Sequence, residues 1–425
     1  MMVYREILLS SAATLIFPDN GDPFMVSLAD IQEAHRRIAG HVIRTPLVFS
    51  PSLSALAGAR VYLKLETLQN AGSFKARGAT NKILANIAAI RELGVVAASA
   101  GNHAQGIAVA AGSAGIKAAI VMPQWASIAK QEATRGYGAE VLLYGSSLEE
   151  SIARAGELAR EGRLFIHPYD DDEVIAGQGT IGIEILEDLP GTDMVIVPVG
   201  GGGLIAGIAT AAKGIKPGIR IIGAQAASCP SASEAIAAGS PVRVTALPTI
   251  ADGIRVAESG ARTFPVLEEL VERIVLASED EIADAMLLLL ERKHVVAEGA
   301  GAVPLAVLLN GSIPISPGST VVLVISGGNV DSAQLFRIVR QAMARQGRIL
   351  RFSVLLDDRP GALAGLLTVI AEQGGNIVHI DHTQGEGDVP VMMARVEIEL
   401  ETRGKEHAGF ILSAIGNAGY AVRTG

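Results

Sequence analysis

The pattern of hydrophobic and polar positions divides this chain into two unequal units. From about residue 61 to residue 325, short and nearly all-apolar runs alternate with alanine-rich stretches at helical spacing. Such runs are typical of strands buried on both faces of a parallel sheet, and their alternation with helices predicts an α/β unit. The predicted strands are Val61–Lys64, Val95–Ser99, Ala118–Met122, Glu140–Tyr144, Met194–Pro198, Arg220–Gln225 and Val321–Ile325.

The pattern changes near residues 346–348, which we take as a domain boundary. Residues 349–425 have the order strand, helix, strand, strand, helix, strand, which predicts a ferredoxin-like α+β domain. Its predicted elements are Ile349–Leu356, Gly361–Gln373, Ile377–Thr383, Val391–Leu400, Ala408–Ala418 and Tyr420–Arg423, with a turn at residues 385–388 between the two middle strands.

The first residues require a separate interpretation. Ile7–Phe17 resembles the apolar segment of a signal peptide but is too short to span a membrane. We favour the alternative that residues 1–24 are an extension upstream of a natural start at Met25, outside the folded core. Ser27–Asp30 has the spacing of a capping box and predicts the start of the first helix.

Composition and charge restrict the possible partners. The net charge is −9 and no block of basic residues occurs, so a nucleic-acid partner is not expected, and we also expect no membrane partner. Cys229 is the single cysteine, which excludes a disulfide within the chain and favours a reducing compartment, the cytoplasm. The histidines are scattered without cysteine partners, so no metal site is predicted.

Glycine-rich turns follow three predicted strands, after Ser99, after Val199 and after Ile325. Because the carboxyl ends of parallel strands meet at one edge of a sheet, these turns are expected to converge on one crevice. The second turn, Gly200–Gly203, precedes a predicted helix that starts at Leu204, and a glycine loop before a helix suits a phosphate monoester.

Two other phosphate-binding motifs fit this loop less well. Gly201, Gly203 and Ala206 have the spacing of the dinucleotide fingerprint, but the next strand ends at Gln225 and not at an acidic residue. A nucleotide P-loop would need a Gly-Lys-Ser/Thr sequence, which is absent.

Lys75, in the sequence Gly72-Ser73-Phe74-Lys75, is the candidate reactive amine. A lysine that bonds covalently to an aldehyde must be partly desolvated, and Phe74 could supply an apolar face to stack on a ring. The alternative is a solvated lysine at a helix start. An amine, a phosphate loop, a carboxylate-sized loop and a late Ser-Gly-Gly turn together match what pyridoxal phosphate chemistry needs.

The remaining candidates belong to the first and third turns. Ser99, Ala100 and Gly101 lead into Asn102 and His103, and the amides and hydroxyl of this loop could bind a substrate carboxylate. Asn102 could also donate to a phenolate oxygen of the cofactor. His103 is either a base or a packing residue, and packing is the favoured interpretation. A hydroxyl at Ser326 would leave a pyridine nitrogen unprotonated, which favours elimination over transamination.

From about Ile31 to Ser332 these motifs resemble the fold type II pyridoxal phosphate enzymes, the tryptophan synthase β-like family, and most closely its threonine dehydratase and serine racemase branch. Further matches are His167–Tyr169, Ile175–Thr180, Ala251–Gly253 and Glu298–Ala302. The resemblance implies a two-lobed catalytic unit at 25–345, with a smaller lobe at about 60–165 inserted in it. It implies that Lys75 carries the cofactor and that the cofactor contacts Phe74, Asn102, Gly200, Gly201, Gly202, Gly203, Leu204 and Ser326.

Two departures from the racemases sharpen the expected activity. Racemases of this branch have a serine where Ala100 stands, and acidic ligands for a cation near the positions of Gln225 and Ser231. The expected activity is therefore a threonine ammonia-lyase that eliminates the β-hydroxyl after Lys75 removes the α-proton. The alternatives are a serine dehydratase or racemase on the same scaffold, or a non-catalytic amino-acid sensor.

Residues 349–425 resemble an ACT domain through Asp358-Arg359-Pro360-Gly361 and Gly374-Gly375-Asn376. The resemblance implies a regulatory unit that binds an amino acid between subunits, with Asp358, Pro360 and Gly361 as candidate effector residues. Pro360-Gly361 could instead simply form the turn. The resemblance also implies a homo-oligomer, a dimer or a tetramer, and suggests a role in isoleucine biosynthesis.

Overall fold

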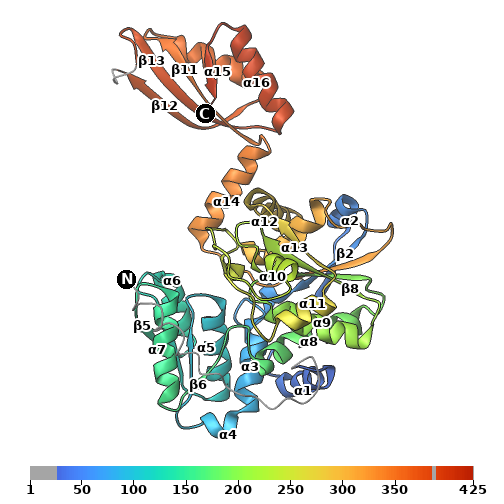
Figure 1. Ribbon diagram of the computed structural model, residues 1–425. Helices are drawn as coiled ribbons and strands as arrows, with labels where there is room; N and C mark the ends of the chain where they lie inside the picture. Colours follow the sequence, from blue (N-terminus) through green and yellow to red (C-terminus); the bar gives the residue numbers. More distant parts are fainter. Residues whose placement is uncertain (1–25, 385–388, 425) are drawn as a thin grey trace, which may run out of the picture.

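The computed structural model describes residues 26–384 and 389–424. Two sheets with their helices form a large and a small lobe, and a third sheet with two helices stands apart at the end of a long helix (Figure 1). The N-terminal segment and the turn predicted at residues 385–388 lie outside the described residues.

The large lobe is built on a six-stranded sheet. Its strands run parallel except β1, which pairs antiparallel with β2. Their order is β1 (Leu47–Phe49), β2 (Arg60–Leu65), β10 (Thr320–Ile325), β7 (Met194–Pro198), β8 (Arg220–Ala226) and β9 (Arg273–Ala277). The pairing of β2 with β10 and of β10 with β7 brings together chain segments that are far apart in the sequence.

The small lobe is built on a four-stranded parallel sheet. Its order is β5 (Glu140–Leu143), β4 (Ala118–Met122), β3 (Val95–Ala98) and β6 (Leu164–Phe165). All seven strands predicted for the α/β unit are present, and each begins and ends within one residue of its predicted bounds. β2 lies within the range expected for the small lobe but pairs in the larger sheet, and the division into domains stays a prediction.

Helices cover both faces of the sheets and join the lobes. The large lobe carries α1 (Leu28–Ile38), α2 (Pro51–Ala57), α8 (Asp172–Asp188), α9 (Gly203–Ile215), α10 (Ser231–Ala238), α11 (Phe264–Leu270), α12 (Glu279–Lys293), α13 (Gly299–Leu309) and the 3-10 turns η1 (Glu66–Leu68) and η2 (Asp252–Ile254). The small lobe carries α3 (Lys75–Ala85), α4 (Ile87–Ile90), α5 (Asn102–Ala114), α6 (Ile128–Gly136) and α7 (Leu148–Arg160). The predicted capping box of α1 is confirmed, with Ser27 and Asp30 as its two members.

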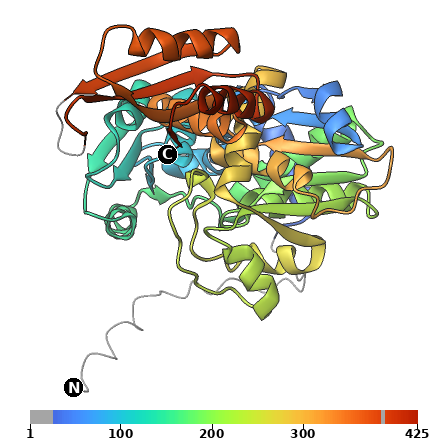
Figure 2. The same ribbon diagram turned by 90° about the horizontal axis from the view of Figure 1, so that it is seen from above.

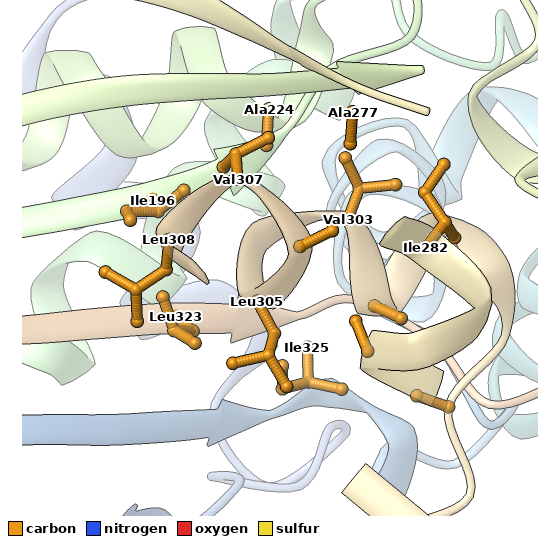
Figure 3. Close-up of a cluster of buried hydrophobic side chains, with 14 of the residues drawn as sticks. Ile196, Ala224, Ala277, Ile282, Val303, Leu305, Val307, Leu308, Leu323 and Ile325 are labelled. Carbon is orange, nitrogen blue, oxygen red and sulfur yellow. The ribbon is translucent and has the colours of Figure 1, made fainter. Parts of the chain in front are cut away.

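One apolar helix packs directly on the larger sheet. Val303, Leu305, Val307 and Leu308 of α13 lie against Ile196, Leu323 and Ile325 of the central strands (Figure 3). On the opposite face α8 and α9 pack on the same strands in a second core. Among the described residues no helix combines the length and the apolar character needed to cross a bilayer.

The C-terminal unit has the predicted order of elements. Its antiparallel sheet has the order β12 (Asn376–Gln384), β13 (Met393–Glu401), β11 (Ile349–Asp357), β14 (Val422–Thr424), and α15 (Ala362–Glu372) and α16 (Lys405–Asn417) pack on it. It is connected through α14 (Ser332–Arg345). Arg345 pairs with Asp280 and Asp284 of α12, which ties α14 to the large lobe. Seen from above, this unit lies over part of the two lobes (Figure 2).

Candidate active site

The segment before Lys75 and the turn after β10 are in contact. The Phe74 amide donates to the carbonyl of Ser326 at 3.0 Å, and Ser73 forms an isolated bridge with Gly327. Asn329, at the end of the same turn, donates to Asn102 Oδ1 at 2.9 Å. Two of the three turns predicted from the sequence to converge, those after Ser99 and after Ile325, therefore meet here.

Lys75 is the first residue of α3, and its side chain is half-buried. Its amine donates to the carbonyl of Pro168 at 2.6 Å and lies 5.1 Å from the centre of the Phe74 ring. Burial lowers the pKa of Lys75 to about 8, against the opposing charge of Glu298. A larger fraction of this amine is neutral at physiological pH than for an ordinary lysine, as a nucleophile or base requires.

The glycine loop lies beside the segment that Lys75 contacts. It packs against Tyr169, the residue that follows Pro168. A Cβ on Gly201 would run into the Tyr169 ring, and a Cβ on Gly203 would lie 2.6 Å from the Tyr169 carbonyl. Gly202 has a φ of 98°, in the left-handed region that favours glycine. The loop ends at α9, whose first turn includes the buried Leu204. Its backbone therefore forms a cradle at a helix N-terminus, suited to a phosphate.

The loop after β3 joins the strand to α5. The Ser99 hydroxyl accepts from the Gly101 amide at 3.2 Å, and α5 begins at Asn102. His103 is buried, and its Nε2 lies 3.0 Å from the carbonyl of Ile166. Burial lowers the pKa of His103 to about 3, so the ring is neutral and donates to that carbonyl. This geometry supports the packing interpretation of His103.

Glu298 is a site residue that the sequence analysis did not select. It is the N-cap of α13 and is buried, and its Oε1 accepts from Asn102 Nδ2 at 2.7 Å. Burial, and to a lesser extent the Asp252 carboxylate, raise the pKa of Glu298 to about 7. The available signal was a lone carboxyl before an almost wholly apolar helix, within a segment already noted for its resemblance to the family.

These residues fit pyridoxal phosphate. Within the described part of the chain, Ser73 Oγ is buried and has no hydrogen-bond partner. Gly327 has no room for a side chain, because a Cβ there would lie 2.5 Å from Glu298 Oε1. Ser326 is buried beside them, so the site combines hydroxyls, a phosphate cradle and a desolvated amine. Ser73, Asn102 and Ser326 could contact the ring, and the loop from Gly200 to Gly203 could hold the phosphate.

Gln225 and Ser231 stand where a carboxylate cation site was considered in the sequence. Gln225 is buried, donates to the Ser231 hydroxyl at 3.3 Å and accepts from the amides of Ala232 and Ser233 at 3.2 Å each. Both the nitrogen and the oxygen of the Gln225 side-chain amide are therefore hydrogen-bonded to neighbouring groups of the protein.

The predicted effector residues lie in the turn between β11 and α15. The Asp358 carboxylate accepts from Gln384 Nε2 at 2.7 Å, and Gly361 is the N-cap of α15 with a φ of 90°. The helix begins at Ala362, one residue later than predicted, and Pro360 directly precedes the N-cap residue Gly361. The reason is the left-handed backbone of Gly361, which a helical residue cannot have.

Comparison with known proteins gives two family matches. Residues 38–327 match the family described as pyridoxal-phosphate dependent enzyme, and residues 348–403 match the ACT domain. An L-threonine ammonia-lyase of Thermotoga maritima is 46% identical over 400 residues, which is 94% of this chain and 99% of that protein. A second protein of that name, from Geobacter sulfurreducens, is also 46% identical, over 92% of this chain and 98% of its own.

Solved structures agree with the fold. The processed form of threonine deaminase isoform 2 from Solanum lycopersicum is 36% identical with a TM-score of 0.69, and the match covers 74% of this chain and 92% of that one. A maize serine racemase is 36% identical with a TM-score of 0.71, over 76% of this chain and 100% of its own. By its sequence and its site geometry, this chain belongs to the pyridoxal-phosphate dependent enzymes and carries a C-terminal ACT domain.

Proposed function

We propose that the protein is a threonine ammonia-lyase that converts L-threonine to 2-oxobutanoate and ammonia. The observation that carries this proposal is the position of Lys75, whose amine contacts Pro168 while the next residue, Tyr169, packs on the glycine loop. The candidate base and the phosphate cradle therefore contact two consecutive residues, Pro168 and Tyr169, and lie close together. The 46% identity to two L-threonine ammonia-lyases over nearly the whole chain supports the choice of substrate.

Different residues of the chain bind the cofactor, bind the substrate and transfer the proton in this elimination. Bound pyridoxal phosphate supplies the electron sink for loss of the α-proton. Lys75 anchors the cofactor and then takes the α-proton, which its lowered pKa favours. The amides after β3 and the Ser99 hydroxyl bind the substrate carboxylate at the start of α5. In the net reaction, the α-proton and the β-hydroxyl are lost as one water, and a second water hydrolyses the unsaturated amine product to the 2-oxo acid and ammonia.

A substrate panel tests this proposal. Purified protein should absorb near the visible edge, and borohydride treatment should remove that band and leave the reduced cofactor on the peptide that contains Lys75. L-Threonine should then give 2-oxobutanoate with a larger kcat/KM than L-serine gives pyruvate. A higher kcat/KM for L-serine would instead identify a serine dehydratase, and absence of the band would favour the non-catalytic sensor.

We further propose that an amino acid regulates the enzyme through the ACT domain. Isoleucine or valine would bind near Asp358, Pro360 and Gly361, between paired ACT domains of a homodimer or homotetramer in the cytoplasm. Isoleucine inhibition would suit a biosynthetic role. Threonine saturation curves with and without each effector, together with the molecular mass in solution, test the site and the assembly. An unchanged curve with every branched-chain amino acid would contradict regulation by this class of ligand.

A further inference from the structure

A cluster of four charged side chains lies inside the protein, next to the start of α3. Its members are Lys64, Glu66, Arg77 and Glu184, with exposed fractions between 0% and 3%. The two positive and two negative groups balance formally. Their hydrogen bonds go to one another and to groups near Ile43, Thr45 and Thr180, and the proposed reaction does not use them.

Arg77 is at the centre of this cluster, two residues after Lys75. Its guanidinium donates to both oxygens of Glu66, at 2.9 and 2.8 Å, and to both oxygens of Glu184, at 2.6 and 2.9 Å. It also donates to Thr180 Oγ1 and to the Ile43 carbonyl, each at 3.2 Å. A planar guanidinium with two bidentate carboxylate partners is held in one orientation. The ammonium group of a lysine would not be fixed in this way.

The two carboxylates belong to different elements of the large lobe. Glu66 lies in η1, directly after β2, and Glu184 lies on α8. The pair of Arg77 and Glu66 therefore closes the segment from residue 66 to residue 77, which contains Lys75. The middle of this segment is tied to Ser326 and Gly327. A Cβ on Gly177 of α8 would lie 2.6 Å from the Gly78 Cα, so the two helices are also in close contact there.

Stability alone is a poor explanation of this cluster. Buried ion pairs lose hydration, and apolar replacements of the same volume are often as stable or more so. Orientation is a better explanation, because Lys75 must reach both the cofactor and the α-proton from one backbone position. A misplacement of about 1 Å at such a group can cost on the order of a hundredfold in rate.

We propose that Arg77 is a positioning residue for Lys75, which holds the first turn of α3 in register with the large lobe. This inference rests on the proposed function only in the role of Lys75. Lys64 provides a matched control, since its amine is equally buried and binds Glu184 at 2.5 Å, but it lies on β2, and its two hydrogen bonds go to Glu184 of α8 and to the Thr45 carbonyl and not to a residue of α3.

The test compares Arg77→Lys with Lys64→Met in the full-length holoenzyme. Both variants should lose resistance to urea. Only Arg77→Lys should lower kcat for L-threonine, by roughly tenfold or more with KM within about twofold, because the base is displaced and not the substrate site. It should also slow the capture of pyridoxal phosphate by the apoenzyme by roughly tenfold and shift the midpoint pH of the visible band. Lys64→Met should change these three quantities much less than Arg77→Lys does, because both bidentate pairs of Arg77 remain in that variant.

Two outcomes would overturn the proposal. One is a loss of kcat that follows the loss of stability equally in both variants, which would make the cluster a structural element only. The other is an unchanged capture rate and band midpoint in folded Arg77→Lys.

If Arg77→Lys is insoluble, Glu66→Gln replaces it, because glutamine keeps the shape of the glutamate side chain and one acceptor oxygen. Glu66→Gln should lower kcat, slow the capture of pyridoxal phosphate and shift the band midpoint, each to a smaller extent than Arg77→Lys. Values equal to those of the unmodified enzyme would overturn the proposal. If the unmodified enzyme captures pyridoxal phosphate and shows the band but does not turn over L-threonine, the proposed substrate is wrong, and the capture rate and band midpoint of Arg77→Lys still decide the role of Arg77.

Discussion

Asn102 Nδ2 donates a hydrogen bond of 2.7 Å to Glu298 Oε1, between residues that are 196 positions apart in the chain. Asn102 is the first residue of α5 in the small lobe, and Glu298 caps α13 in the large lobe. The same Asn102 accepts from Asn329 through its Oδ1. One side chain of the small lobe is therefore held by two groups of the large lobe at the candidate cofactor site.

The raised pKa of Glu298 predicts a defined change of stability with pH. Between pH 4.5 and about 7 the folded protein keeps a proton on Glu298 that the unfolded chain has released, so this group's contribution to stability falls as the pH rises. Glu298→Gln keeps the acceptor for Asn102 but cannot titrate. In the cofactor-free protein, the free energy of unfolding of the variant minus that of the unmodified protein should rise by up to about 3 kcal/mol across this window.

Urea unfolding of both proteins at several pH values measures that difference. His103 and His167, with pKa values lowered to about 3 and about 4, change stability in the opposite direction over an overlapping range. Their contribution is common to both proteins and cancels. A difference that does not depend on pH would show that Glu298 titrates like an exposed carboxyl.

Lys75→Ala should abolish turnover while the protein stays folded. The lysine is both the covalent anchor and the base, and loss of a general base alone costs at least about a hundredfold in rate. The glycine loop does not depend on Lys75, so the variant should still bind pyridoxal phosphate reversibly. Equilibrium dialysis and a 2-oxobutanoate assay measure the two properties. Near-normal dehydration by a verified variant would contradict the assigned role of Lys75.

Ala100→Ser should raise the formation of D-serine relative to pyruvate. The loop after β3 places no hydroxyl at residue 100, and a second proton donor is needed to return a proton to the opposite face of the α-carbon. The unmodified enzyme should therefore form D-serine slowly or not at all from L-serine. Chiral chromatography of both proteins measures the ratio, and equal rates of D-serine and pyruvate formation by the unmodified enzyme would refute this interpretation of the loop.

Gly201→Ala should weaken cofactor binding. Its Cβ would meet the Tyr169 ring, so either the ring or the phosphate cradle must move, at a cost of about 1–3 kcal/mol that corresponds to roughly a fivefold to hundredfold rise in the Kd of pyridoxal phosphate. Gly156→Ala in α7 is the control, since its Cβ would have no heavy atom within 4 Å. A normal cofactor Kd in folded Gly201→Ala would place the phosphate elsewhere.

Elements of the fold with a local signal in the sequence could be predicted, and those without one could not. The buried parallel strands were predicted because uninterrupted apolar runs such as Met194–Pro198 need no partner to be recognised. β1 and β6 were missed because two or three residues carry no measurable period, and the five-residue strand β9 was missed as well.

Long-range pairs were beyond the sequence for a physical reason. Lys75 and the glycine loop were found through motifs, but the contact of Lys75 with Pro168 joins residues 93 positions apart. Arg77 and Glu184 are 107 positions apart, and each taken alone is read as a solvated charge. The pair of Arg77 and Glu184 follows from the packing of α3 on α8, which periodicity does not encode.

One carboxylate joins the linker helix α14 to the ACT sheet. Glu399 is buried and accepts from Arg340 of α14 through both oxygens at 2.6 Å, and from Arg351 of β11 at 2.6 Å. Arg340 connects the two units, whereas Arg351 stays within the ACT domain.

If an amino-acid effector acts through α14, Arg340→Met should weaken its effect on threonine affinity, since the ACT sheet then loses its charged contact with the linker. The coupling free energy, of about 1–3 kcal/mol in the unmodified enzyme, should fall by at least about half. Arg351→Met removes a bond to the same carboxylate without touching the linker and should keep the coupling. Threonine saturation curves for the three proteins, each with and without isoleucine or valine, give these values. Equal loss of coupling in both variants would assign the effect to disruption of the ACT sheet and not to the linker, while full coupling in Arg340→Met would exclude this contact as the route.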